Sequence, residues 1–345
     1  MVLTAPARAA TPIQTFNSRR AQDAYGRTMT YLRISLTDRC NFRCVYCMPA
    51  TGMQFQPRDE ILTDEELLRV VHLCTKLGFR KLRLTGGEPT IRPHLVELIR
   101  EMKQFPGVDE ISMTTNGLLL GRMAEELRLA GLDRINVSID TLDPLKFKLI
   151  TRGGRLDLVL QGIEAAEASG MRPIKLNAVV VKGHNEHEVA DLAALTLTHD
   201  WEVRFLEIMP MEGVGVVYDE GLITSEETQA ELEQHFGTLL PIDTDPSDPA
   251  RLWQIPGALG KIGFISPISA PFCAACNRVR LTADGKLRLC LLRQDEIDFR
   301  DLLRNGVTDG ELEKLLLGGI WRKPWGHGVA EGDRSIGRGM SQIGG

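Results

Sequence analysis

The sequence predicts an α/β protein built around a parallel sheet, and two observations support this. Between about residues 30 and 210, short β-rich runs alternate with amphipathic segments of helical length. The chain has 345 residues, of which 43% are hydrophobic and 25% charged, enough for one large α/β barrel plus an appendage. Periodicity alone leaves both a partial barrel and a doubly wound open sheet possible, and either fold places its chemistry at the carboxyl ends of the strands.

Six strands are predicted in this region: Tyr31–Ser35, Lys81–Thr85, Glu110–Thr114, Arg134–Ser138, Ile174–Val181 and Val203–Glu207. The predicted helices between them include Asp64–Leu77, Leu119–Ala130 and Leu156–Ser169. In the first of these helices, Thr63 and Glu66 form a capping box, and Cys74 lies on the apolar stripe. We therefore expect Cys74 to be a buried core thiol without a function.

After about Gly213 the alternation stops, and short apolar runs such as Lys261–Ile265 and Val279–Leu281 follow a Pro- and Asp-rich stretch. The turn at Asp284–Gly285 indicates a hairpin, so we expect a mainly antiparallel β appendage. The predicted divisions are a flexible extension over 1–23, the strand–helix region over 24–212, a C-terminal region over 213–333 and a mobile Gly-Gly tail over 334–345.

Composition limits the class of partner. A net charge of -5 and a pI near 5.9 argue against a nucleic-acid-binding surface, so a phosphate-bearing substrate would need a local cluster of bases. The sequence contains no apolar run long enough for a membrane span and no secretory signal. Six of the seven cysteines form two tight groups, which indicates metal ligation in a reducing cytoplasm.

The first cysteine group is Cys40, Cys44 and Cys47, directly after the first predicted strand. Three thiolates hold three irons of a cubane cluster and leave the fourth iron open for a ligand. A structural zinc ion would normally take four protein ligands, and no fourth Cys or His lies nearby in the sequence.

This C-x3-C-x2-C pattern resembles that of the radical S-adenosylmethionine superfamily. The resemblance implies a partial (βα)6 barrel of the TIM type and a [4Fe-4S] cluster whose open iron is chelated by S-adenosylmethionine. One electron then cleaves the sulfonium to a 5′-deoxyadenosyl radical, while the protein positions the reactants and excludes water.

A second motif, Gly86-Gly87-Glu88-Pro89, follows the second predicted strand. Its glycines allow close backbone approach to a ligand, and the carboxylate of Glu88 can accept hydrogen bonds from an ammonium group. It resembles the motif with which the superfamily binds the methionyl amine. The resemblance further implies contacts to S-adenosylmethionine from Tyr46, Gly87, Ser138 and Met209.

The second cysteine group is Cys273, Cys276 and Cys290, and its spacing implies a second [4Fe-4S] cluster with an open iron. A zinc ion completed by a distant histidine such as His327 is the alternative. Between these cysteines, the alternation Arg278-Val279-Arg280 aims both guanidinium groups to one side of a strand, as in a clamp for phosphate oxygens or a purine edge.

Further bases fall on separate predicted strands at Arg33, Arg83, Lys175 and Arg204. Taken together, the motifs resemble the GTP 3′,8-cyclase family of molybdenum-cofactor biosynthesis. The family's GTP-binding positions match Arg33, Arg83, Thr114, Lys175, Arg278, Val279 and Arg280. Its terminal Gly-Gly, which reaches into the active site, matches Gly344 and Gly345.

The resemblance implies a lyase that converts GTP to (8S)-3′,8-cyclo-7,8-dihydroguanosine 5′-triphosphate. Hydrogen abstraction from ribose C3′ is followed by attack of the carbon radical on guanine C8. It also implies an electron donor such as a flavodoxin or ferredoxin, a downstream cyclic pyranopterin monophosphate synthase and a homodimer.

Two other interpretations stay open. A peptide-modifying maturase with two clusters would usually carry more than three cysteines in its appendage. A zinc-stabilised module that binds protein or RNA through Arg278 and Arg280 would be colourless. A Rossmann dehydrogenase is excluded because no G-x-G-x-x-G follows the first strand.

Overall fold

The computed structural model describes residues 20–329, 332 and 336–344, and in these the chain forms two compact units. Of the described residues, the first unit contains 20–40, 54–112, 273–329, 332 and 336–344, and the second contains 41–53 and 113–272. Each unit is therefore assembled from segments that are far apart in the sequence. Most of the predicted flexible extension, residues 1–19, and residues 334, 335 and 345 of the predicted tail lie outside the described residues.

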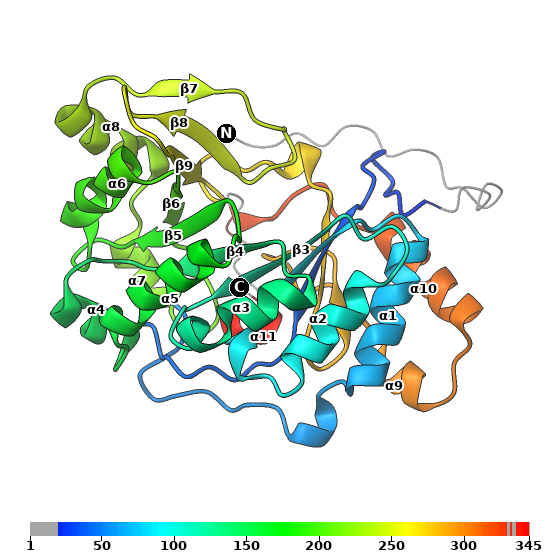
Figure 1. Cartoon of the computed structure of the whole chain (residues 1–345). Helices are drawn as coiled ribbons and strands as arrows, with labels where there is room; N and C mark the ends of the chain where they lie inside the picture. The colour runs from blue at the N-terminus through cyan, green and yellow to red at the C-terminus, as the bar shows by residue number, and fades with distance from the viewer. Residues whose placement is uncertain (1–19, 330–331, 333–335, 345) are drawn as a thin grey trace. The chain divides into compact units, whose positions relative to one another are not determined.

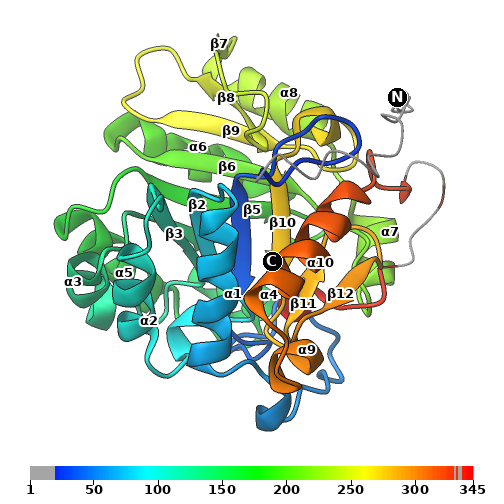
Figure 2. The ribbon, with the colours of Figure 1, turned by 90° about the vertical axis from the view of Figure 1, so that its right-hand side faces the viewer.

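The first unit contains a mixed sheet with the order β12-β11-β10-β1-β2, and β3 follows β2. Its strands are β1 (Tyr31–Ser35), β2 (Lys81–Thr85), the start of β3 (Glu110–Thr115), β10 (Arg278–Leu281), β11 (Lys286–Arg288) and β12 (Glu296–Asp298). Its helices are α1 (Asp64–Lys76), α2 (Leu95–Lys103), α9 (Arg300–Arg304), α10 (Asp309–Trp321) and α11 (Met340–Ile343). Figure 2 shows β10 beside β1, although about 240 residues separate them in the sequence.

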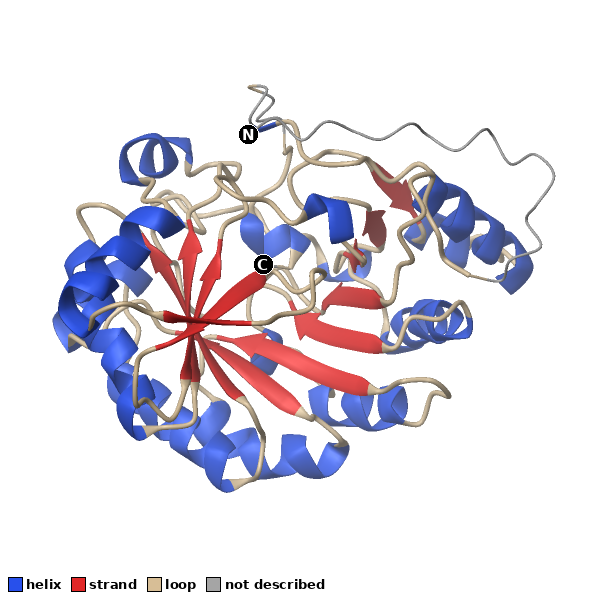
Figure 3. Cartoon of the chain, turned by 90° about the horizontal axis from the view of Figure 1, so that it is seen from above, coloured by secondary structure: helices blue, strands red, loops and turns tan. Residues whose placement is uncertain are grey.

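The second unit has the strand order β4-β5-β6-β9-β8-β7. Its strands are β4 (Arg134–Ser138), β5 (Ile174–Val180), β6 (Glu202–Glu207), β7 (Leu240–Ile242), β8 (Ala250–Gln254) and β9 (Lys261–Ile265). Its helices are α3 (Leu120–Ala130), α4 (Pro144–Thr151), α5 (Leu156–Ala168), α6 (Val189–Thr198), α7 (Gly215–Gly221) and α8 (Ser225–Phe236). The strands β7, β8 and β9 lie side by side in Figure 1, and Figure 3 distinguishes the strands, in red, from the helices, in blue.

All six predicted strands are present, and their ends differ from the prediction by at most one residue. The predicted capping box at Thr63 and Glu66 also forms, because each side chain bonds the other residue's backbone N–H. Cys74 is fully buried, as expected, and burial raises the pKa of its thiol to about 12.

The C-terminal strands are mainly antiparallel, as predicted, and two of them also pair in parallel with earlier strands. The hairpin at Asp284–Gly285 joins β10 to β11, and β7, β8 and β9 are also antiparallel to one another. However, β9 pairs in parallel with β6, and β10 pairs in parallel with β1. In each unit the C-terminal strands therefore extend the sheet that the early strands begin, because an open edge of a parallel sheet offers unpaired N–H and C=O groups.

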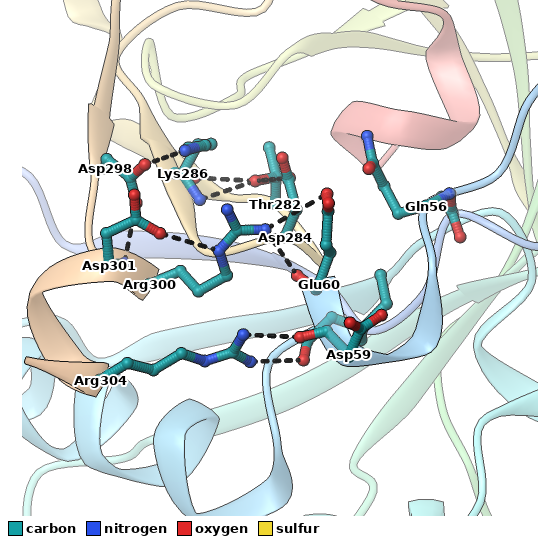
Figure 4. Close-up of polar contacts among 12 residues, drawn as sticks. Gln56, Asp59, Glu60, Thr282, Asp284, Lys286, Asp298, Arg300, Asp301 and Arg304 are labelled. Carbon is teal, nitrogen blue, oxygen red and sulfur yellow. Dashed lines mark hydrogen bonds and ion pairs between the residues drawn. The ribbon is translucent and has the colours of Figure 1, made fainter.

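Polar contacts also join the early and late segments of the first unit (Figure 4). The guanidinium of Arg304 donates to the backbone carbonyl of Asp59 at 2.6 Å, and Arg300 lies 3.4 Å from a carboxylate oxygen of Glu60. Lys286 of β11 forms an ion pair with Asp298 of β12. The two arginine contacts attach α9 to the loop before α1, whereas the Lys286–Asp298 pair joins β11 to β12.

No helix among the described residues combines the length and the apolar character needed to cross a membrane.

Candidate active site

In the second unit, Cys44 and Cys47 lie in a tight turn that is attached to α4. The backbone N–H groups of Cys47 and Met48 both donate to the carbonyl of Cys44 at 3.0 Å. The N–H of Val45 donates to the carbonyl of Ile150 in α4, also at 3.0 Å. Both cysteine residues are partly exposed.

In the first unit, the chain that leads to Cys40 runs beside the Gly86–Pro89 motif. Gly87 N–H donates to the Thr37 carbonyl at 2.6 Å, and Glu88 N–H donates to the Arg39 carbonyl at 2.8 Å. A side chain at Gly87 would overlap the Arg39 backbone, because a Cβ there would lie 2.7 Å from the Asp38 carbonyl oxygen and closer still to that of Arg39. The motif thus needs glycine for close backbone approach.

Glu88 is buried, with 1% of its surface exposed. Its Oε1 accepts from the backbone N–H of Thr90 at 3.0 Å and from the Thr90 hydroxyl at 2.5 Å. The carboxylate therefore caps the short turn that follows it, and this contact fixes its direction.

Tyr46, between the two cysteines of the second unit, donates its hydroxyl to Asp140 Oδ2 at 2.7 Å. Asp140 Oδ1 accepts from the backbone N–H of Val179 at 2.9 Å. Burial raises the pKa of Asp140 to about 6, and burial together with Asp140 raises the pKa of Tyr46 well above its ordinary value. Asp140 was not among the predicted site residues, although an acid two residues past the end of β4 was a usable signal.

Four arginines form a row across the first unit's sheet. In register, Arg83 of β2 lies beside Arg33 of β1, Arg33 beside Arg280 of β10, and Arg280 beside Arg288 of β11. Burial, Arg280 and Arg83 hold the pKa of Arg33 well below its ordinary value, and burial lowers the pKa of Arg280 to about 10. Arg288 is paired with Glu296, whereas closely spaced like charges repel one another at the other three arginines, so an anion bound there would be favoured.

Tyr31 organises one end of the row. Its hydroxyl accepts a hydrogen bond from Arg83 Nε, and its ring lies 5.1 Å from the guanidinium carbon of Arg278. The alternation predicted for β10 holds, since Arg278 and Arg280 are partly exposed while Val279 is 1% exposed. Val279, a predicted substrate position, therefore has only its backbone available.

The C-terminal tail lies at the carboxyl ends of β1 and β2. Gly344 has a φ of 71°, and its carbonyl accepts a hydrogen bond from Arg280. A Cβ at Gly344 would lie 3.0 Å from the Cβ of Ser35 and would overlap the hydroxyl of Thr85. These two residues are register partners at the ends of their strands, so Gly344 fits closely against that edge. Gly345 is not among the described residues.

Two cations from distant segments hold the second cysteine group. Arg27 donates to the carbonyl of Cys273 at 2.7 Å, and Lys323 donates to the carbonyls of Arg278 and of Leu289, the residue before Cys290. No sequence signal identified Arg27 or Lys323, because both act on backbone groups far away in the chain.

The pKa values of these thiols differ. Burial and then Cys290 raise the pKa of Cys273 to about 11. Burial opposes ionisation of Cys276 as well, but Lys323 and the Arg278 N–H outweigh it and lower the Cys276 pKa. The thiols of this group are close enough for their charges to interact.

In the second unit, Lys175 of β5 faces Glu202 of β6, with Nζ 2.7 Å from the carboxylate. The same carboxylate pairs with Arg204. Burial and Arg204 lower the pKa of Lys175 to about 8. The predicted base is thus partly neutralised by Glu202, which the sequence analysis did not identify.

The other predicted positions of the second unit occupy strand ends. Ser138 ends β4, Thr114 lies near the end of β3, and Met209 follows β6. All three are partly exposed, which suits contact with a ligand.

The donor atoms present fit iron–sulfur clusters, because each sequence group supplies three partly exposed thiols. The zinc alternative needs a ring nitrogen of His327 as the fourth ligand. In the structure, Cys273 instead accepts a hydrogen bond from the backbone N–H of His327, and Nδ1 of the His327 ring accepts one from the Val329 N–H. Within residues 20–329, 332 and 336–344, no three His, Cys, Asp or Glu side chains form a group arranged to hold a metal ion.

Two families match the sequence along its length. The family described as the radical SAM superfamily matches residues 34–196, and the family described as Molybdenum Cofactor Synthesis C matches residues 201–329. Among solved structures, Streptococcus suis SuiB bound to its precursor peptide SuiA aligns with a TM-score of 0.58 at 14% identity, covering 83% of this chain and 66% of that one. SuiB bound to S-adenosylmethionine aligns with a TM-score of 0.56 at 13% identity, covering 83% and 68%. These likenesses show the radical SAM fold.

Several curated relatives are much more similar in sequence. A GTP 3′,8-cyclase of Peptoclostridium acidaminophilum is 46% identical over 94% of this chain and 98% of its own length. A GTP 3′,8-cyclase of Heliobacterium modesticaldum is 45% identical over 94% of this chain and 99% of its own. At this identity over nearly complete lengths, the chain belongs to the GTP 3′,8-cyclase family of the radical S-adenosylmethionine superfamily.

Proposed function

We propose that this protein is a radical S-adenosylmethionine GTP 3′,8-cyclase, a lyase that makes (8S)-3′,8-cyclo-7,8-dihydroguanosine 5′-triphosphate in the first step of molybdenum-cofactor biosynthesis. The observation that carries the proposal is the row of arginines next to the tail. Arg33, Arg83 and Arg280 lie side by side, and Arg280 also bonds Gly344.

When bound, the first [4Fe-4S] cluster and S-adenosylmethionine together supply the 5′-deoxyadenosyl radical that takes hydrogen from ribose C3′. Cys40, Cys44 and Cys47 hold the cluster. Gly87 and Glu88 offer a close backbone and a fixed carboxylate to the methionyl amine. Tyr46, Ser138 and Met209 are further proposed contacts to S-adenosylmethionine.

The arginines bind the triphosphate of GTP. Guanidinium forks match phosphate oxygens in pairs, and bound phosphate removes the repulsion between neighbouring arginines. Thr114 and Lys175 are proposed as further GTP contacts. Because Lys175 already pairs with Glu202, its contribution to phosphate binding is smaller than that of an unpaired lysine.

Cys273, Cys276 and Cys290 would hold a second [4Fe-4S] cluster, which would supply an open iron to the guanine, and Arg278 and the backbone of Val279 are the proposed substrate contacts next to these cysteines. The proposal also includes two partners, an electron donor of the flavodoxin or ferredoxin type and a downstream cyclic pyranopterin monophosphate synthase. It further includes a homodimer and a cytoplasmic location. The cytoplasmic location rests on the cysteines, because six of the seven form two tight groups, a usage that favours metal ligation in a reducing compartment.

The test is anaerobic purification, determination of iron and sulfide, and turnover with dithionite, S-adenosylmethionine and GTP. We expect about eight irons per chain, from two cubanes, and equal amounts of 5′-deoxyadenosine and cyclised nucleotide by mass spectrometry. About four irons would remove the second cluster from the proposal. A colourless zinc protein without turnover would favour the binding-module interpretation instead.

A further inference from the structure

We propose that one face of α4 is the docking surface for the protein that supplies the reducing electron, a small acidic one-electron carrier. This face, the α4 face, consists of Leu145, Lys148, Leu149 and Arg152. The inference rests on the proposed function, because that reaction takes one electron to cleave S-adenosylmethionine and a second electron, with a proton, to reduce the cyclised nucleotide radical to the dihydro product.

The α4 face is apolar and exposed where a helix normally buries leucine. Leu145 and Leu149 are 74% and 72% exposed, whereas Phe147 and Ile150 on the same helix are 1% and 4% exposed. Leu145, Lys148 and Leu149 are spaced i, i+3 and i+4 and therefore lie on one side of the helix, and Arg152 is the left-handed residue that directly follows its last turn. Adjacent exposed leucines rimmed by polar groups are typical of a protein-binding site.

The charge on this face is positive. Lys148 and Arg152 are exposed and, in the part of the chain that the structure describes, neither forms an ion pair. The flanking Lys146 and Arg155 are paired with carboxylates, and Asp143 caps the start of the helix. In a chain with a net charge of -5, this local excess of positive charge selects an acidic partner.

The α4 face also lies next to the loop that carries two cluster ligands. Beyond the Val45–Ile150 hydrogen bond, Arg43 N–H donates to the carbonyl of Thr151 at 3.0 Å. Arg152 donates to the carbonyls of Arg43 and Met48 at 3.0 and 2.8 Å. A carrier on this face is thus separated from the Cys44–Cys47 turn by about one helix diameter, roughly 10 Å.

The transfer itself is simple. The reduced carrier gives one electron and is oxidised by one electron, the cluster is reduced by one electron, and no bond forms or breaks. Dithionite, a small diffusing reductant, needs no docking surface. The two reductants therefore separate docking from catalysis.

The test uses the full-length protein with both clusters and an acidic flavodoxin in its hydroquinone form. The variants are Leu145→Glu with Leu149→Glu, and Lys148→Glu alone. Leu129→Glu is the matched control, because Leu129 is an isolated leucine on α3 of the same unit and is 81% exposed. Oxidation of the flavodoxin is followed by stopped-flow absorbance, and cyclised nucleotide is measured in parallel with dithionite.

We expect both α4 variants to oxidise flavodoxin at least about tenfold more slowly than the wild type, and the wild-type rate to fall as ionic strength rises. Dithionite-driven product should be unchanged in every variant, and the Leu129 control should match the wild type with both reductants.

Flavodoxin oxidation at the wild-type rate in both α4 variants would overturn the proposal. The proposal would also be overturned if light scattering showed a changed oligomeric state in the α4 variants while their flavodoxin oxidation stayed at the wild-type rate. The α4 face would then form a contact between copies of this chain. Absence of cyclised nucleotide with dithionite would refute the proposed function, whereas the flavodoxin oxidation rate still decides the docking.

Discussion

Replacing Gly344 by alanine tests whether the tail must lie against the ends of β1 and β2. Two effects oppose alanine there. The backbone has a φ of 71°, in the left-handed region, which costs an L-residue about 1 kcal/mol relative to glycine. The new methyl group would also overlap Thr85 and press against Ser35, so the tail must shift and lose the hydrogen bond from Arg280.

That hydrogen bond comes from a charged donor and contributes about 1.5–3 kcal/mol. The combined cost of about 2.5–4 kcal/mol lowers the population of the correctly placed tail by roughly two to three powers of ten. We expect Gly344→Ala to keep its iron and its affinity for S-adenosylmethionine while product formation with dithionite falls by a similar factor.

Gly306→Ala is the matched control, because Gly306 has a similar φ of 78° and no atom within 4 Å of the position of the added Cβ. It shares the backbone cost but makes no steric clash. If Gly344→Ala turned over GTP as fast as this control, the placement of the tail would have no role in the reaction.

Three further predictions concern single side chains. Arg278→Ala should weaken GTP binding by about 1.5–3 kcal/mol, the scale of one charged hydrogen bond, and unchanged affinity in titration calorimetry would remove Arg278 from the site. Glu202→Gln should lower the free energy of unfolding by about 3 kcal/mol in urea, because Lys175 and Arg204 would lose the carboxylate between them. Burial raises the pKa of Asp140 to about 6, so the folded protein retains a proton that the unfolded chain releases between about pH 4 and 6. The free energy of unfolding should therefore fall by up to about 3 kcal/mol as pH rises through this window. Asp140→Asn should flatten this pH dependence. An unchanged slope in the variant would assign the pH dependence to another group.

The parallel strands could be predicted from the sequence because each one is a short run of β-branched and apolar residues with a helix after it. Their positions agree with the structure to within a residue. The partners of β9 and β10 could not be predicted in this way. Both are short apolar strands that suit either orientation, and only the open edges of β6 and β1 decide that they pair in parallel.

For the site, motif spacing identified the cysteines, the glycine turn and the arginines of β1, β2 and β10. It did not identify Asp140, Glu202 or Lys323. Each of these acts on a partner from a distant segment, through a hydroxyl, an ion pair or a backbone carbonyl. Such pairings arise only when the strands are placed in register, and only Asp140, two residues past the end of β4, left a local signal in the sequence.

The parallel pairing of β10 with β1 also affects how the protein is made. During synthesis β1 emerges early and gains β2 as a neighbour, but its other edge stays unpaired until residues 278–281 have left the ribosome. Arg27 likewise cannot donate its hydrogen bonds to the carbonyls of Cys273 and Trp325 until those residues have been synthesised. The second unit ends at Phe272, so its chain is complete before that of the first. A nascent chain stalled before Cys273 would therefore carry an open sheet edge that is prone to aggregation, and the first unit should be the last part of the protein to fold.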